Sequence, residues 1–373
     1  MADGLREAHA RYKETAIRWG FIWALWCAVL WGAWYVPGFA LFFEEPFASF
    51  QNTTNEGLQT AAAITAANAA AVLLAMFLWV AVLGKTREYG RTIRRFGKIS
   101  KWYFAGAIFG GPMAIYGSYL AIYQIGAQFG AVAALLYPIV GAALARAWYK
   151  EKITQRAALG ILVIVLGGVV IFTPGLAAEI TGTGDGAWLG YLGGLMAVVG
   201  WGIEGAIAGR ALDVTDPDVG LTIRFTAETL YWFVLILPLS AIWLGDNIWS
   251  LIGNGLQSGA VLLWLGLAGL TFGFCYVSWY KSFPLIGVGR GQAIADLYAM
   301  FALGWLTLFT LDLPEWQFFV GALICILGGF IMYTERRDVL EVIRTVPGIG
   351  RVQGEAEPVL AGGTGDMTGV PRS

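Results

Sequence analysis

The stretch IGAQFGAVAALLYP at residues 125–138 recurs 161 residues later as IGVGRGQAIADLYA at residues 286–299. The match continues without a gap to a shared LGG, and 11 of the 44 positions from 125 to 168 are identical. Glu151 stands opposite Asp312 in the polar stretch that follows each copy. A shared framework of Gly, Tyr and acidic residues at one spacing predicts that the chain contains two related halves.

The sequence around both copies is too apolar for a water-soluble domain. Of all residues 58% are hydrophobic and 13% are charged, against roughly 25% charged in ordinary soluble domains. A span of the hydrocarbon core needs ~20 helical residues, and each long uncharged run holds one or two such lengths. These runs are Trp19 to Phe43, Gly57 to Gly84, Trp102 to Ala145, Ala157 to Ala178 and Asn247 to Tyr280.

Dividing these runs at Gly, Pro and polar residues predicts ten transmembrane helices, five in each half. We expect them near 19–43, 57–84, 102–123, 127–145, 157–178, 187–209, 219–244, 257–280, 285–311 and 316–334. The predicted organisation is a cytoplasmic segment at 1–18, a first five-helix repeat at 19–178, a second at 187–335 and a cytoplasmic tail at 336–373. That tail is rich in Gly, Pro and small residues, a composition typical of disorder.

The distribution of charge predicts the orientation of these helices. With the N-terminus in the cytoplasm, every one of the 24 Lys and Arg residues lies near an inner end, and the outer loops carry only acids. The positive-inside rule then gives an N-in, C-in topology. Because five is an odd number of spans, the second repeat must be inverted relative to the first. Inverted repeats are typical of secondary transporters, which alternate between two similar states around a central site.

The N-terminal segment has no short apolar stretch with a small-residue cleavage site, so we expect no removable signal peptide. This favours a prokaryotic inner (cell) membrane. The basic stretch from Lys85 to Lys101 is either a topology determinant alone or also a contact for anionic lipids.

Several classes of function are not expected. Cys27, Cys275 and Cys325 lie apart in apolar spans, and the single histidine, His9, lies in the N-terminal tail. This set gives no metal site, redox cofactor or Ser-His-Asp triad. We therefore expect no enzyme and no cofactor. We also expect no nucleic-acid partner, because no basic groove with interleaved aromatic residues is present.

Motifs in the first half carry a family resemblance. In order, they are Trp31-Gly32, the run from Gly130 to Pro138, KEKIT at 150–154, and the helix from Gly160 to Gly168. Over residues 19–335 the chain resembles the EamA-type transporters of the drug/metabolite transporter (DMT) superfamily. It departs from the pattern in having Ala299 where the first half has Pro138, and DLPE at 312–315 instead of a basic loop. The resemblance implies a ten-helix alternating-access carrier for small metabolites, with a cavity between the repeats. We expect the protein to be a monomer or homodimer.

Three acids lie within the predicted spans, and each needs a partner, water or a proton there. Glu228 lies four residues after Arg224 on one helix, which favours a structural ion pair. Glu204 has no clear basic partner, so we expect a carboxyl at which a proton and a cation compete, or else a protonated carboxyl between helices. Asp296 is expected to line the cavity or to pair with Arg290 or Lys281.

Aromatic residues concentrate on the helices that line the cavity of this family. Aromatic faces attract organic cations by ~0.5–2 kcal/mol each, although packing is the commoner role of any single ring. We expect an aromatic wall at the substrate site that combines with Glu204 and Asp296. Its members are Trp31, Trp34, Tyr35, Tyr137, Trp201 and Tyr298.

These features predict a secondary transporter of a small organic cation or amine, proton-coupled or facilitative, with Glu204 and Asp296 as proton sites. One alternative is a carrier or exporter of neutral or zwitterionic metabolites such as amino acids. Another, of a different class, is a non-transporting membrane scaffold or a lipid-moving protein.

Overall fold

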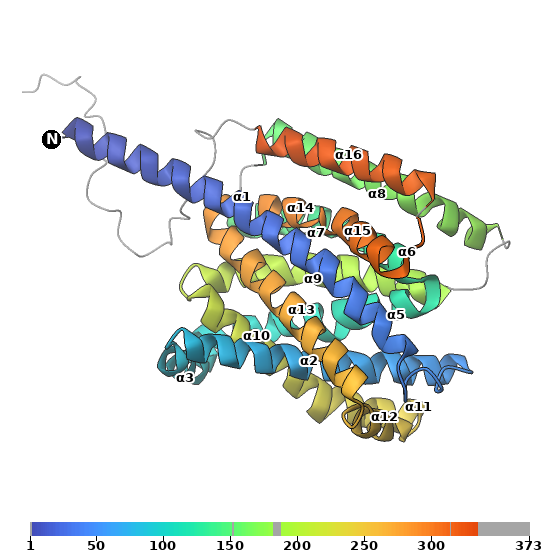
Figure 1. Cartoon of the computed structure of the whole chain (residues 1–373). Coiled ribbons are helices and arrows are strands. Elements are labelled where there is room, and N and C mark those ends of the chain that lie inside the picture. The colour runs from blue at the N-terminus through green and yellow to red at the C-terminus, as the bar shows by residue number, and fades with distance from the viewer. Residues whose placement is uncertain (1, 151–152, 182–187, 314, 335–373) are drawn as a thin grey trace, which may run out of the picture.

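The computed structural model describes residues 2–150, 153–181, 188–313 and 315–334, and the regular elements in these ranges are all helices (Figure 1). Glu151 and the predicted tail at 336–373 lie outside the described residues. The first-half elements are α1 (Ala2–Ala40), η1 (Leu41–Phe43), α2 (Thr54–Val82), α3 (Thr86–Arg94), η2 (Phe96–Ser100), α4 (Lys101–Ile108), η3 (Phe109–Ile115), α5 (Tyr116–Ile125), α6 (Ala127–Ala133), α7 (Tyr137–Tyr149) and α8 (Gln155–Ile180). The second-half elements are α9 (Trp188–Leu212), α10 (Pro217–Leu230), η4 (Tyr231–Ile236), α11 (Leu237–Leu244), α12 (Asn247–Gly255), α13 (Gly259–Ile286), α14 (Val288–Ala295), α15 (Tyr298–Thr310) and α16 (Trp316–Tyr333).

The lengths and composition of these helices are those of an integral membrane protein. Seven helical stretches in the described residues are long and apolar enough to cross a membrane, and two shorter apolar helices cover Gln155–Ile171 and Trp316–Met332. Large apolar side chains also cover the outer surface; Trp243 is 85% exposed and Leu308 is 70% exposed. A surface of this kind is stable against lipid rather than water. The all-helical membrane class predicted from composition is confirmed.

Two of the predicted helices are broken, which the sequence analysis missed. The expected helix at 127–145 is divided into α6 and α7, and the one at 285–311 into α14 and α15. In the first, Pro138 has no N–H to donate to the preceding turn, so the helix restarts there. In the second, Asp296 and Leu297 form the junction, with the Leu297 amide bonded three residues back to Ile294. Hydropathy does not reveal such breaks, because both sides of each junction are apolar.

Other departures from the predicted spans are smaller. The segment at 1–18, expected to be separate from the first span, is helical from Ala2 and continuous with it. Two short helices that were not predicted, α3 and α12, follow α2 and α11.

The broken helices obey the 161-residue shift. α6 and α14 begin at residues 127 and 288, and α7 and α15 extend over 137–149 and 298–310. The glycines before them, Gly126 and Gly287, have φ values of 82° and 86°, in the region that favours glycine. Lys150 and Leu311, which end the second pieces, are also left-handed, with φ of 55° and 62°. The shared sequence therefore corresponds to a shared backbone.

The last helix of each copy packs against the other in antiparallel fashion. A Cβ on Gly160 would lie 2.9 Å from the Gly328 carbonyl oxygen, and one on Gly167 would lie 2.6 Å from that of Gly321. The two contacts exchange under the 161-residue shift, because Gly321 corresponds to Gly160 and Gly328 to Gly167. Small residues permit this close approach of α8 and α16.

The helices form a bundle in which α8 and α16 lie along one edge and α2, α10 and α11 along the other (Figure 1). Between them, α1 packs along α13 and onto α15, and α9 packs along α5 and onto α7. The core between them holds most of the buried aromatic and charged side chains.

An ionic cluster holds α2, α10 and α13 together at one end of the bundle. The Lys85 Nζ lies 2.7 Å from Asp216 and 2.8 Å from an Asp218 oxygen, and the Lys281 Nζ lies 3.1 Å from the other Asp218 oxygen. Trp79 donates a hydrogen bond of 3.0 Å to Asp218. Lys85 begins the basic stretch for which a lipid contact was one of two expectations, and it is engaged by two acids. The cluster fixes the helices that carry the buried charges described below.

We predict a modest, pH-dependent contribution of Lys85 to stability. Burial lowers its pKa, but hydrogen bonds to Asp216 and Asp218 outweigh this and raise the pKa above its ordinary value of 10.5. Its contribution is therefore complete below that value and is lost as the pH rises through the folded-state pKa. Lys85→Gln should lower the unfolding midpoint in detergent by the equivalent of about 1 kcal/mol at neutral pH, and the difference from wild type should shrink above pH ~10.5. Lys98→Gln, at an exposed position, is the control; an unchanged difference at alkaline pH would contradict the assignment.

Candidate functional site

Trp31 of α1 is the centre of a buried aromatic cluster. Its ring stacks on Tyr298 of α15 at 4.6 Å between centroids and meets Trp201 of α9 edge-on at 4.5 Å. Tyr137 of α7 lies 5.7 Å away and Trp279 of α13 lies 5.9 Å away. All five side chains are fully buried. Four of the six aromatic residues singled out from the sequence therefore meet at one point.

The other two expected aromatics form a neighbouring layer. Tyr35 stacks parallel to Tyr298 at 5.9 Å. Trp34 stacks on Phe272 at 4.6 Å and donates a hydrogen bond of 3.3 Å to the Asn68 side chain. The aromatic wall is therefore continuous from α1 to α13 and α15.

Asp296 lies at the junction of α14 and α15, directly before the aromatic cluster. Its side chain is fully buried, and neither carboxyl oxygen accepts a hydrogen bond from the described residues. The Asp296 carboxyl interacts electrostatically with the hydroxyl groups of Tyr35, Tyr137 and Tyr298. The expected alternative of a pair with Lys281 is wrong, because that lysine binds Asp218.

Gln292 joins the two broken helices to the centre. The Tyr137 hydroxyl donates a hydrogen bond of 2.8 Å to the Gln292 carbonyl oxygen, and the Gln292 amide donates one of 3.2 Å to the Trp201 carbonyl oxygen. The Gln292 side-chain oxygen has no hydrogen-bond partner among the described residues. The Trp31 indole N–H also lacks one there. Such groups cost about 1–3 kcal/mol each when left unpaired, so a polar ligand that paired with them would stabilise the centre.

The second charged group is built on Arg224 of α10, which bridges two carboxylates. Its Nε lies 2.5 Å from a Glu204 oxygen, and its Nη1 is bonded to Glu228. All three side chains are fully buried. The pairing with Glu228 follows the four-residue spacing. The expectation that Glu204 lacks a permanent partner is wrong, because α10 packs beside α9 and places Arg224 against it.

Tyrosines of α13 complete the coordination of Glu204, and the sequence analysis missed them. Tyr276 donates a hydrogen bond of 2.8 Å to Glu204, and Tyr280 donates one of 3.4 Å. The Trp201 indole N–H donates one of 2.9 Å to the Tyr276 hydroxyl, which links this group to the aromatic cluster. A helical repeat of aromatics at positions 272, 276, 279, 280 and 283 was the available signal.

A distorted segment of the third span makes room for the charges. In η3 the chain follows a π-helical turn that contains Gly110, Gly111 and Pro112. Proline lacks the N–H for a regular helical bond, and π turns are frequent at functional sites. A Cβ on Gly110 would lie 1.9 Å from a Glu204 oxygen and 2.4 Å from an Arg224 nitrogen. The backbone therefore touches the buried ion pairs directly.

We predict that Gly110→Ala destabilises the protein by about 1–3 kcal/mol, the usual cost of overpacking. The added methyl group would displace a Glu204 carboxylate that Arg224 and Tyr276 hold in place. The unfolding midpoint in detergent measures the change. Gly266→Ala, in helix α13 with no atom within 4 Å of the added Cβ, should leave the midpoint unchanged or raise it. Equal midpoints for the two variants would contradict this packing.

The arrangement therefore has two linked parts. One is the charged group Glu204–Arg224–Glu228, in which one Glu228 oxygen has no hydrogen-bond partner among the described residues. The other is the aromatic centre around Trp31, together with the Asp296 carboxyl. The residues described contain no cluster of three or more His, Cys, Asp or Glu that could hold a metal ion. The chemistry available in this region is binding of cations by charge and aromatic faces, and exchange of protons on carboxyl groups.

Comparison with known proteins gives the fold alone. No protein-family model and no curated protein matches the sequence. A solved structure titled "Crystal structure of protein" is similar in fold, with a TM-score of 0.55 and 17% sequence identity, over 84% of this chain and 96% of that one.

Proposed function

We propose that the protein is a secondary transporter that moves a small organic cation or amine across the membrane by alternating access. The observation that carries this proposal is the fully buried Asp296 carboxylate. It lacks a hydrogen-bond partner among the described residues and lies at a helix break two residues before Tyr298, whose ring stacks on Trp31. A buried charge of this kind is costly unless a ligand or a proton neutralises it.

The repeated architecture supports a carrier. We infer ten spans in two inverted repeats with both termini in the cytoplasm, because the shared backbone recurs at 161 residues and α8 and α16 run antiparallel. Broken helices at equivalent positions of inverted repeats are typical of transporter binding sites. The sequence resemblance to EamA-type transporters leads to the same class.

The sign of the buried charge favours a cationic substrate. Three buried carboxyl groups, Glu204, Glu228 and Asp296, lie near the aromatic centre, and Arg224 contacts only the first two. Arg290, also buried, precedes Asp296 by six residues on the broken helix and does not hydrogen-bond to it. An organic cation would neutralise Asp296 and stack on Trp31 and Tyr298.

The charged group favours proton coupling. Arg224 supplies one positive charge for the two carboxylates that it bridges, and one Glu228 oxygen has no hydrogen-bond partner among the described residues. An unpaired charge in a low-dielectric interior costs free energy. A single proton shared by the two carboxyl groups would neutralise the excess negative charge. We propose that this proton exchanges during transport.

The test is reconstitution into proteoliposomes with matched panels of quaternary ammonium, primary amine, zwitterionic and anionic compounds. Substrate-evoked current and lumenal pH are recorded for wild type and Glu204→Gln. We expect signals from the cationic compounds, and loss of the pH change in Glu204→Gln. Equal transport of zwitterions would favour the metabolite exporter instead. No transport of any compound by folded protein would favour a scaffold or lipid-moving protein.

A further inference from the structure

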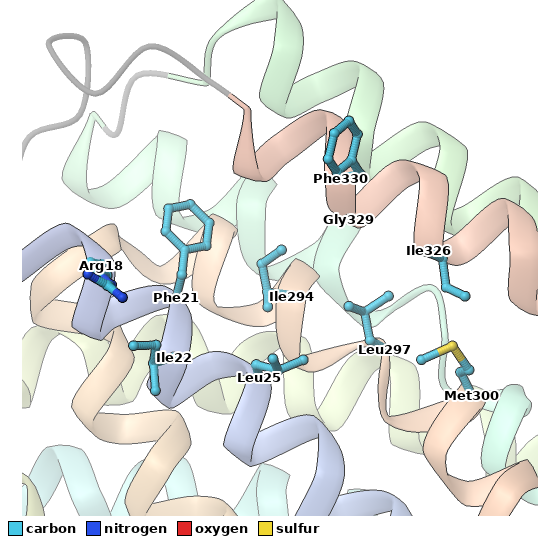
Figure 2. Close-up of a pocket in the computed structure, with 10 residues that line it drawn as sticks. All are labelled: Arg18, Phe21, Ile22, Leu25, Ile294, Leu297, Met300, Ile326, Gly329 and Phe330. Atoms are coloured by element: carbon cyan, nitrogen blue, oxygen red, sulfur yellow. The ribbon is translucent and has the colours of Figure 1, made fainter.

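An apolar groove of about 590 Å³ lies on the outer surface, between α1, the α14–α15 junction and α16 (Figure 2). Phe21 and Leu25 of α1 form one wall, Ile326 and Phe330 of α16 the other, and Leu297 lies between them. The groove is open to the side, since Phe330 is 63% exposed and Leu25 is 44% exposed. In a membrane, these faces meet lipid.

The groove has one charged end. Among its lining residues, Arg18 is the single charged one, and its side chain is exposed. It stands near the start of the first span, Glu14–Phe43, where polar groups reach the membrane interface. From Arg18 to Leu25 the helix advances seven residues, or roughly 10 Å. The groove therefore extends from the interface into the hydrocarbon region, with its cationic end at the interface and its apolar length below.

We propose that this groove is a binding site for an anionic glycerophospholipid, with one acyl chain in the groove and the phosphate at Arg18. Such a lipid matches the groove in two respects. Its negative head group would lie beside the Arg18 cation, and its apolar acyl chain would lie along the apolar walls. No acidic residue lines the groove to repel the head. Anionic head groups are drawn to basic residues at the membrane surface.

The bound chain would touch the helix break. Ile294 and Leu297, which flank Asp296 on either side, both line the groove. A Cβ on Gly329 of α16 would lie 3.2 Å from the Leu297 side chain, so α16 packs tightly on the junction. A lipid bound there contacts the segment that holds Asp296. Lipid binding does not depend on the proposed transport.

The test uses native mass spectrometry of the full-length protein. The protein in detergent is mixed with equimolar phosphatidylglycerol and phosphatidylcholine, and the lipid that stays bound after release from detergent is identified. Wild type should retain phosphatidylglycerol selectively. Arg18→Gln should weaken its retention by about fivefold, because one basic residue contributes about that factor at an anionic surface. Met300→Trp, which fills the groove from α15, should weaken it at least as much.

The matched control is Arg146→Gln, at an exposed arginine of α7 outside the groove, which should retain the lipid as wild type does. Thermal midpoints of all variants check that they are folded. Equal loss in Arg18→Gln and Arg146→Gln would show non-specific attraction and overturn the proposal. Retention unaffected by Met300→Trp, or no preference for phosphatidylglycerol, would also overturn it.

Discussion

Replacement of Arg224 by methionine is expected to destabilise the protein by about 3–5 kcal/mol, the cost of leaving buried charges without their partner. The Arg224 guanidinium binds Glu204 and Glu228, and all three side chains are fully buried. Its loss leaves two buried carboxyl groups without the positive charge that they share. Unfolding by titration with a denaturing detergent, followed by gel filtration of the protein that remains folded, measures the change in stability.

Two further variants separate the loss of charge balance from the loss of packing. The triple variant Arg224→Met, Glu204→Gln, Glu228→Gln removes all three charges and should recover much of the lost stability, because apolar or neutral replacements of buried ion pairs are often tolerated. Arg210→Met, at an exposed arginine whose guanidinium lies 5.3 Å from the Trp102 ring centre, should have little effect. An Arg224→Met protein as stable as Arg210→Met would contradict the buried triad.

Asp296→Asn is expected to weaken binding of an organic cation by at least roughly 30-fold, the lower range for removing one partner of a buried charge pair. The amide keeps the size of the side chain but removes its charge. Because the carboxyl oxygens have no hydrogen-bond partner among the described residues, the variant should fold as well as wild type or better. This combination of lost binding and retained stability distinguishes a ligand site from a structural carboxylate.

Calorimetric titration of purified protein with the best cation of the transport panel measures this effect. Asp312→Asn, at an exposed position after α15, is the control and should bind as wild type. Unchanged affinity in Asp296→Asn would exclude this carboxylate as the cation partner. A loss of stability equal to the loss of affinity would instead indicate a structural role.

The part of the fold that can be predicted from the sequence depends on how far apart along the chain the interacting residues lie. The 161-residue shift predicted the two copies, and the structure shows matching helix starts at 127 and 288 and matching glycines at 126 and 287. Both helix breaks were missed, because the sequence on either side of each junction is apolar. Pro138 was a local signal for the first break that was not used, and the junction at Asp296 has no proline.

In the candidate site, too, the contact within one helix could be predicted from the sequence, and the contact between helices could not. The pair of Arg224 with Glu228 is local to one helix, and its spacing predicted it. The contact of Arg224 with Glu204 joins two helices, and no sequence spacing sets the rotation of α10 against α9. The aromatic residues were harder to sort, because Tyr276 and Trp279 look like the aromatic belt residues of any membrane protein. Only their common face on α13 sets them apart.

The most direct test of a carrier is solute counterflow, which requires alternating access but no knowledge of the coupling ion. Proteoliposomes are loaded with millimolar unlabelled organic cation and diluted into a trace of the same labelled cation. We expect transient accumulation of label above equilibrium by wild type and by Asp312→Asn, and none by Asp296→Asn. Folded wild-type protein that binds the cation but shows no counterflow would contradict the proposal that the protein is a transporter.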